Sequence, residues 1–87
     1  MITIPTTLSK EQIQTTIFDV LCTIAPEANL ADLDPDVNMQ RALDIDSFDF
    51  LNLLIGLDEA LGVTVPEADY GQLVSLNNLI NYLAARL

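Results

Sequence analysis

Apolar residues follow a helical period in three stretches of the chain. The first stretch is preceded by Ser9 and Gln12, which are spaced as a capping box, with Leu8 and Ile13 placed to form a hydrophobic staple. Pro26 disfavours helical geometry in the residue before it. The sequence therefore predicts a helix from about residue 10 to residue 25. Its apolar face consists of Ile13, Ile17, Val20, Leu21 and Ile24.

The second periodic stretch begins at Asp46 or Ser47 and ends at Leu61, where Gly62 provides a C-terminal stop. Its apolar residues fall on two stripes that the 3.6-residue period turns away from each other. The longer stripe is expected to face the core and consists of Phe50, Leu53, Leu54, Leu57 and Leu61. The shorter stripe lies near the N-terminal end and consists of Phe48, Leu51 and Ile55.

The remaining chain predicts a third main helix, a short helix and a long loop. Ser75 caps the last helix, and residues 67–71 can form one or two helical turns before Gly71 interrupts them. Residues 27–46 show no sustained period, so we expect an ordered loop, a connection that is usually functional at this length. The last helix presents Leu76, Leu79, Ile80 and Leu83, and the loop is expected to be held on the core by Leu30, Leu33, Val37, Met39 and Leu43.

These elements predict an all-α fold, a small four-helix bundle with three main helices, one short helix and a long loop between the first two main helices. We expect a single domain over residues 1–87, with residues 1–8 as a flexible N-terminal segment. No apolar run is long enough to cross a membrane, and the first seven residues lack the features of a secretory signal.

Composition narrows the class of protein. Thirteen acidic residues against three basic ones give a net charge of -10, which argues against nucleic-acid binding and predicts basic partners. The chain is 51% hydrophobic, so it is a folded protein and not an acidic disordered one. Cys22 is the only cysteine and lies within an apolar helical pattern. We therefore expect a buried thiol, no intramolecular disulfide and a reducing, cytoplasmic environment.

Ser47 is the candidate functional residue. A serine at a helix start is commonly a cap, but Asp46 can cap this helix itself and leave the Ser47 hydroxyl free. The positive end of the helix dipole favours an anionic group there, including a phosphate ester on that hydroxyl. The chain has no histidine, no base positioned to activate a serine and no glycine-rich phosphate loop. The pattern suits a covalently carried group and does not suit catalysis by this chain alone.

One acidic motif has the spacing of a calcium loop. Asp32, Asp34 and Asp36 alternate with other residues, but Val37 and Leu43 occupy the sixth and twelfth positions, where such a loop needs glycine and glutamate. A solvated acidic surface is the better interpretation, and we expect no metal site.

The residues around Ser47 resemble the modification site of acyl carrier proteins and related peptidyl carrier domains. The resemblance covers roughly residues 9–87, and its last part lies in the terminal helix, over Leu76 to Leu83. Its two other parts are the box Leu43-x-x-Asp46-Ser47-Phe48-Asp49, similar to the family's Leu-Gly-x-Asp-Ser-Leu-Asp, and the continuation Leu53-x-x-x-Leu57-Asp58-Glu59-x-Leu61-Gly62-Val63-x-Val65-Pro66.

The resemblance implies a carrier that is not itself an enzyme. A separate, magnesium-dependent phosphopantetheinyl transferase would attach 4'-phosphopantetheine from coenzyme A to Ser47, with Asp46 assisting its recognition. Acyl groups would then be carried as thioesters on the prosthetic thiol of a monomer that does not insert into membranes. Acyl-loading and acyl-processing enzymes with basic docking patches would recognise a face made of Phe48, Asp49, Leu51, Ile55, Asp58 and Glu59.

Departures from the family pattern refine this expectation. Asp44 replaces the usual glycine, Phe48 the usual leucine, and Asn52 stands where many fatty-acid carriers have glutamate. The less acidic middle of the helix favours a specialised, stand-alone carrier, in a lipid or secondary-metabolite pathway, over a carrier of fatty acid biosynthesis. Phe50 on the core stripe limits the room for a long acyl chain. The alternative is a non-catalytic helical interaction domain with an acidic docking face, in which Ser47 is only a cap and is not modified.

Overall fold

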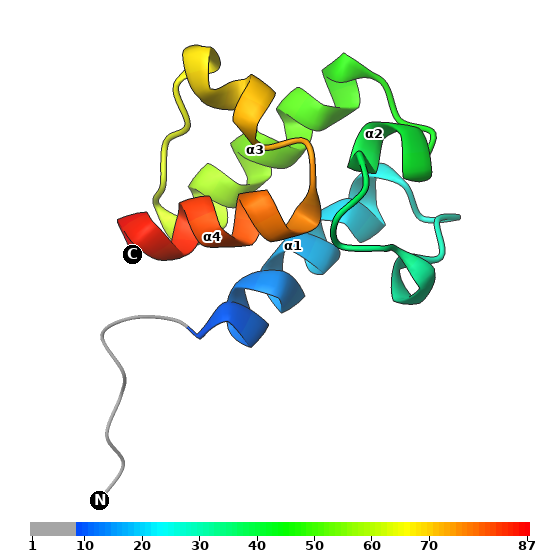
Figure 1. Ribbon diagram of the computed structural model, residues 1–87, viewed down its shortest axis with the longest axis horizontal. Helices are drawn as coiled ribbons and strands as arrows, with labels where there is room; N and C mark the ends of the chain where they lie inside the picture. The colour runs from blue at the N-terminus through cyan, green and yellow to red at the C-terminus, as the bar shows by residue number, and fades with distance from the viewer. Residues whose placement is uncertain (1–8) are drawn as a thin grey trace, which may run out of the picture.

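The computed structural model describes residues 9–87, and in that part of the chain the regular structure is helical apart from one isolated bridge. Three long helices confirm the predicted main helices: α1 (Lys10–Ile24), α3 (Ser47–Leu61) and α4 (Leu76–Arg86) (Figure 1). Three short ones complete the bundle: η1 (Leu30–Asp32), α2 (Met39–Ala42) and η2 (Glu67–Gln72). The staple expected at Leu8 and the flexible segment expected over residues 1–8 lie outside the described residues.

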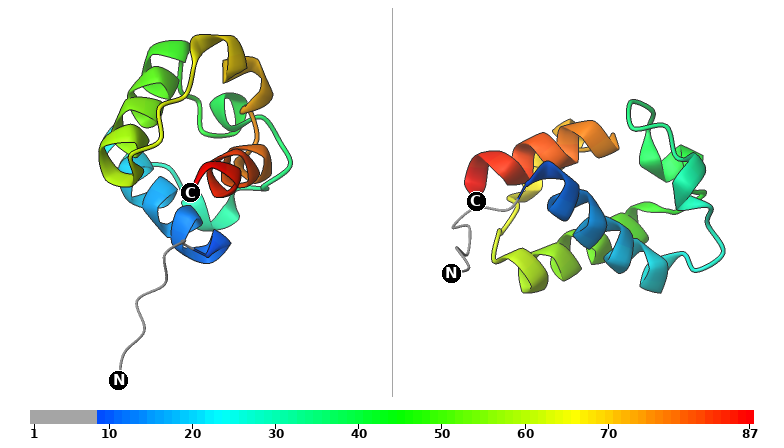
Figure 2. Two further views of the ribbon diagram at one scale, coloured as in Figure 1. Left: turned by 90° about the vertical axis from the view of Figure 1, so that its left-hand side faces the viewer. Right: turned by 90° about the horizontal axis from the view of Figure 1, so that it is seen from below.

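The connection between α1 and α3 gathers at one end of the bundle, opposite the C-terminal end of α4, as Figure 1 and the right-hand view of Figure 2 show. α1 packs against both α3 and α4. The start of α3 therefore lies at the end of the molecule that carries α2 and the loop. No helix within residues 9–87 is long and apolar enough to cross a membrane.

Local signals at the helix ends account for where the long helices begin and stop. The Ser9 hydroxyl accepts a hydrogen bond from the Gln12 amide at 3.2 Å, and the Ser9 amide donates to the Gln12 side chain at 2.8 Å. This is the predicted capping box. α3 ends at Gly62, whose left-handed φ of 72° suits a residue without a side chain. Ser75 caps α4 as predicted.

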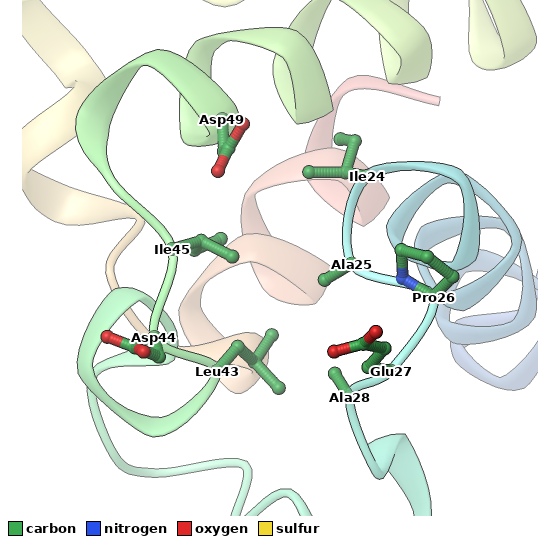
Figure 3. Close-up of a pocket in the computed structure, with 9 residues that line it drawn as sticks. All are labelled: Ile24, Ala25, Pro26, Glu27, Ala28, Leu43, Asp44, Ile45 and Asp49. Carbon is green, nitrogen blue, oxygen red and sulfur yellow. The ribbon is translucent and has the colours of Figure 1, made fainter.

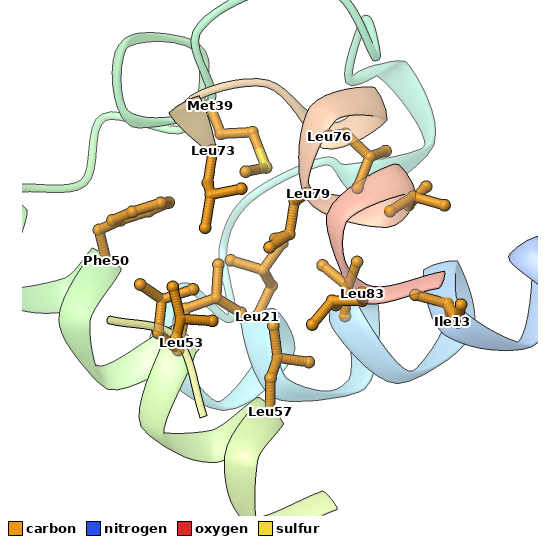
Figure 4. Packing of buried hydrophobic residues seen from close by; sticks show 14 of the residues in the cluster. Ile13, Leu21, Met39, Phe50, Leu53, Leu57, Leu73, Leu76, Leu79 and Leu83 are labelled. Carbon is orange, nitrogen blue, oxygen red and sulfur yellow. The ribbon is translucent and has the colours of Figure 1, made fainter. Parts of the chain in front are cut away.

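The core is mostly aliphatic, and the predicted faces of the three long helices supply most of it, with Phe50 as its aromatic member (Figure 4). The longer stripe of α3 is buried except for Leu61, which is half-buried at the helix end. Each buried leucine or isoleucine contributes about 1.5–3 kcal/mol. The residues that meet in the centre include Ile13, Ile17, Leu21, Leu53, Leu57, Leu79 and Leu83.

The connection expected as a loop contains two short helices, η1 and α2. α2 begins after Asn38, whose side chain accepts a hydrogen bond from the Arg41 amide at 3.2 Å. Met39 is completely buried, and its amide donates to the carbonyl of Val74 at 2.8 Å. Four residues are too few to form a stable helix alone. α2 therefore owes its stability to this burial and to its attachment beside the start of α4.

Three local expectations are wrong. Cys22 is exposed, because it follows the buried Leu21 and each helical residue turns by about 100° around the axis. Val37 is 40% exposed and does not anchor the loop; it lies in a turn in which its amide donates to the carbonyl of Asp34 at 3.4 Å. The short helix η2 is a 3₁₀ helix that runs through Gly71 to Gln72, since Gly71 does not adopt the positive φ that would interrupt it.

Candidate functional site

α3 begins at Ser47, directly after its cap Asp46. One carboxylate oxygen of Asp46 accepts a hydrogen bond from the Asp49 amide at 2.8 Å, and the Asp46 carbonyl accepts from the Phe50 amide at 3.0 Å. Asp46 thus performs the capping, as the sequence predicts, and Ser47 occupies the first helical position with an exposed side chain. The Ser47 hydroxyl is not needed to hold the helix end.

The chain's three serines all stand at helix starts, which allows a direct comparison. The hydroxyls of Ser9 and Ser75 each accept a hydrogen bond from the amide three residues ahead, at 3.2 Å. Within residues 9–87, the contact made by the Ser47 hydroxyl is with the Gln40 side-chain amide at 3.5 Å, beyond the usual range for a hydrogen bond. Ser47 is therefore the serine whose hydroxyl is available for chemistry.

The segment before Ser47 is held in one conformation by Gln40 and Asp44. The Gln40 carbonyl accepts a hydrogen bond from the Ile45 amide at 3.0 Å. The side chain of the same residue, Gln40, approaches the Ser47 hydroxyl. Asp44 has a φ of 54°, the left-handed region that favours glycine. This geometry gives a physical reason for the glycine that the carrier motif has at this position. Gln40 had no signal in the sequence, because its helix α2 shows no period.

The electrostatics at the start of α3 suit a phosphate ester on Ser47. The Asp46 side chain accepts a hydrogen bond from the Asp49 amide. The amides of Ser47 and Phe48, in the same first turn, remain without an intrahelical partner. These amides and the helix dipole stabilise an anion at this end. An exposed hydroxyl at the first helical position thus fits a covalently attached phosphate group. In residues 9–87 no three histidine, cysteine, aspartate or glutamate side chains are grouped to hold a metal ion.

The shorter apolar stripe of α3 lies at the surface beside Ser47. Phe48 is 70% exposed and Ile55 is 49% exposed, while Leu51 between them is half-buried. These are unusually exposed positions for large apolar side chains, and exposed apolar patches commonly mark interaction sites. We refer to Phe48, Leu51 and Ile55 as the α3 stripe.

The three acidic residues expected around the α3 stripe differ in their availability. Glu59 is exposed and Asp49 is half-buried. Asp58 is also half-buried, and one of its carboxylate oxygens accepts a hydrogen bond from the Thr64 hydroxyl at 3.2 Å. Asp58 is therefore partly engaged in holding the segment that follows α3, which leaves Glu59 as the most accessible of the three carboxylates.

A hollow of about 490 Å³ that the sequence did not predict opens between the end of α1 and the segment that leads into α3 (Figure 3). The apolar residues Leu43 and Ile45 on either side of Asp44 were its only sequence signal. It is lined by Ile24, Ala25, Pro26, Glu27, Ala28, Leu43, Asp44, Ile45 and Asp49. We call it the α1–α3 hollow.

Comparison with known proteins places this geometry in context. Residues 13–83 match a family model described as a phosphopantetheine attachment site. An acyl carrier protein of Acidothermus cellulolyticus is 26% identical over 77 residues, covering 88% of this chain and 90% of that protein. Polyketide-8 synthase acyl carrier protein 2 of Streptomyces avermitilis is 29% identical over 85 residues, covering 98% of this chain and 92% of that protein. The solution structure of a candidate acyl carrier protein from Anaplasma phagocytophilum has the same fold, with a TM-score of 0.77 at 20% identity over 94% of this chain and 96% of that one.

Proposed function

The chain belongs to the acyl carrier protein family, whose members bear covalently attached 4'-phosphopantetheine, and on this basis we propose that Ser47 is the residue that bears it here. The family match covers residues 13–83, which include Ser47 and Ser75 but not Ser9. Ser75 is only 6% exposed and caps α4. The observation that carries the proposal is that Ser47 alone of the three combines an exposed side chain with a hydroxyl free of capping.

When attached, the group supplies a thiol that holds acyl groups as thioesters. The amides of Ser47 and Phe48 at the start of α3 would stabilise its phosphate. Asp46 keeps one carboxylate oxygen beyond the one used in capping, which is available to a phosphopantetheinyl transferase. The chain is thus a carrier and a substrate of enzymes, and not itself a catalyst.

Partner enzymes would dock on the surface formed by the α3 stripe and its carboxylates. Exposed Phe48 and Ile55 supply apolar area, and Glu59 and Asp49 supply negative charge. A net charge of -10 favours enzymes that present basic patches and opposes association between copies of the chain. We therefore propose a monomer that acyl-loading and acyl-processing enzymes recognise through this face, with Asp58 contributing less than Glu59.

We further propose a specialised pathway, in lipid or secondary metabolism. The Streptomyces relative is by name a carrier of a polyketide synthase, and it aligns with 98% of this chain. Asn52 is exposed in the middle of α3, where it leaves the docking helix less acidic than a glutamate would. The alternative of an unmodified interaction domain does not account for the match to a phosphopantetheine attachment family.

Mass spectrometry of the intact chain tests the attachment site. The chain would be incubated with coenzyme A, magnesium and a broad-specificity phosphopantetheinyl transferase. Wild type and the matched control Ser9→Ala should each gain the mass of one phosphopantetheine, whereas Ser47→Ala should gain none while keeping its helical circular dichroism. Modification of Ser47→Ala, or no modification of wild type, would refute the assignment.

A further inference from the structure

The side chain of Gln40 points an unused hydrogen-bond donor at the proposed attachment site. Its amide nitrogen lies 3.5 Å from the Ser47 hydroxyl oxygen, too far for a strong hydrogen bond. Within residues 9–87 the Gln40 side chain makes no other hydrogen bond. Gln40 is also half-buried, which restricts where its side chain can go. A glutamine amide carries two N–H groups, so this side chain can still donate to a group placed at Ser47.

The backbone fixes the position of Gln40 relative to Ser47. The preceding residue, Met39, is completely buried and donates its amide to the Val74 carbonyl at 2.8 Å. The Gln40 carbonyl accepts a hydrogen bond at 3.0 Å from the amide of Ile45, two residues before Ser47. Neither of these bonds uses the Gln40 side chain. A substitution at position 40 should therefore leave α2 and the start of α3 in place while removing the donor.

Attachment of the phosphopantetheine arm changes which hydrogen bonds the Ser47 oxygen can make. A free hydroxyl both donates and accepts, whereas an ester oxygen has lost its proton and can only accept. The phosphate also adds outer oxygens beyond the ester oxygen, and these share a negative charge. A separation of 3.5 Å between the Gln40 nitrogen and the Ser47 oxygen leaves an outer oxygen room to approach to hydrogen-bond distance. A bond to a charged acceptor is shorter and stronger than one to a neutral hydroxyl.

The charges around Ser47 make a neutral donor valuable to a phosphate. Asp46 and Asp49 stand beside it in the sequence, and within residues 9–87 no cationic side chain forms an ion pair with either one. Arg41 follows Gln40 on α2, but a helical residue turns by about 100°, so its side chain leaves the helix in another direction. Gln40 is therefore the side-chain donor that the described structure directs at Ser47.

We propose that the Gln40 side-chain amide donates a hydrogen bond to the phosphate of the arm on Ser47, and thereby sets the direction in which the arm leaves α3. Gln40 is a positioning residue: it holds the base of the arm against α2 and does not touch the acyl group. This inference rests on the proposed function, because it needs the arm on Ser47.

Nuclear magnetic resonance of the full chain tests the contact directly. The side-chain amide protons of Gln40 would be followed in proton–nitrogen correlation spectra before and after phosphopantetheine is attached. Attachment should move one of them downfield, as a bond to a charged oxygen does. The amide protons of Gln14, which is also half-buried but lies in the first half of α1, should not move. This measurement needs no variant, so it stands even if a substitution at position 40 unfolds the chain.

Urea unfolding gives the size of the effect. Wild type and Gln40→Met, which keeps the length of the side chain without a donor, would each be unfolded with and without the arm. General effects of the added charge cancel in this cycle. The arm should raise the folding equilibrium constant about two- to tenfold more in wild type than in Gln40→Met, the range that one hydrogen bond supplies. The matched change Gln14→Met should respond to the arm as wild type does.

The outcomes separate this inference from the proposed function. Gln40 amide protons that do not move on attachment, or an equal effect of the arm in wild type and Gln40→Met, would overturn the inference while leaving the attachment site intact. A chain that gains no phosphopantetheine mass would refute the proposed function itself, and this inference with it.

Discussion

Replacing Gly56 by alanine brings two opposing effects into one measurement. Gly56 lies inside α3 where this helix packs against α1. A Cβ at this position would lie 2.7 Å from a methyl carbon of Val20 on α1, about 1 Å closer than carbon atoms normally pack. Alanine in a helix interior is favoured over glycine by about 1 kcal/mol. The added methyl should therefore stabilise the helix and at the same time force α1 and α3 apart.

The overlap should outweigh the gain in helix propensity. Val20 is β-branched and has essentially one side-chain rotamer in a helix, so it cannot turn away cheaply. Overpacking of this kind costs about 1–3 kcal/mol. Set against the helix gain, Gly56→Ala should lower the free energy of unfolding by up to about 2 kcal/mol. In a Val20→Ala background the overlap is gone, and the same change should raise it by about 1 kcal/mol.

Urea unfolding followed by circular dichroism measures all four variants of this cycle at one salt concentration. The coupling between the two positions should be about 1–3 kcal/mol, and none of the substitutions changes the charge of the chain. If Gly56→Ala changes the free energy of unfolding equally, within about 0.5 kcal/mol, with valine or alanine at position 20, then α1 and α3 do not approach each other at these positions as closely as the structure indicates.

Three further predictions concern the site, its docking face and the far end of the bundle. In urea unfolding, Asp44→Ala should be less stable than Asp44→Gly by about 1 kcal/mol, because only glycine relieves the left-handed backbone; equal stability would contradict that strain. Stopped-flow binding to a basic partner such as the transferase should show slower, salt-sensitive association for Glu59→Gln. The complex of Ile55→Ala with the partner should instead dissociate faster, by a factor that corresponds to about 1–2 kcal/mol and changes little with salt. Unfolding of this variant would place Ile55 in the core. The Tyr82 hydroxyl donates to Asp69 at 2.7 Å, which raises the pKa of Tyr82 above its usual value; the stabilisation from this bond is present below pH ~10 and is lost as pH rises through the raised value. Asp69→Asn should lower the pKa of Tyr82, as followed by ring proton shifts, and an unchanged titration would show that the bond is absent in solution.

The long helices could be predicted because their signals are local. Capping residues stand within one turn of the helices they start, at Ser9, Asp46 and Ser75, and Gly62 ends α3 in the conformation its type suggests. The same reasoning separated the buried stripe of α3 from the exposed one. The availability of the Ser47 hydroxyl could be predicted from Asp46 in the same way, since the capping hydrogen bond joins residues only three positions apart.

What the sequence did not reveal depends on contacts between distant segments. α2 exists because Met39 is buried and bonded to Val74, 35 positions further along the chain by their numbering. The α1–α3 hollow likewise needs residues from the end of α1 and the start of α3. Cys22 was misplaced for another reason: it does not belong to the apolar face of α1, and the helical turn of about 100° after the buried Leu21 already placed its side chain away from the core.

The exposed position of Cys22 has a practical consequence for following the carrier through its cycle. Because the chain has one cysteine and it is accessible, a thiol reagent has one target on the unmodified protein. Attachment of the prosthetic arm adds a second target, and acylation of that arm removes it again. Counting reactive thiols would thus report the proportions of empty, armed and loaded carrier, provided that Cys22→Ser supplies the baseline. The same thiol lets two copies be crosslinked through α1, on a helix that carries neither Ser47 nor the α3 stripe.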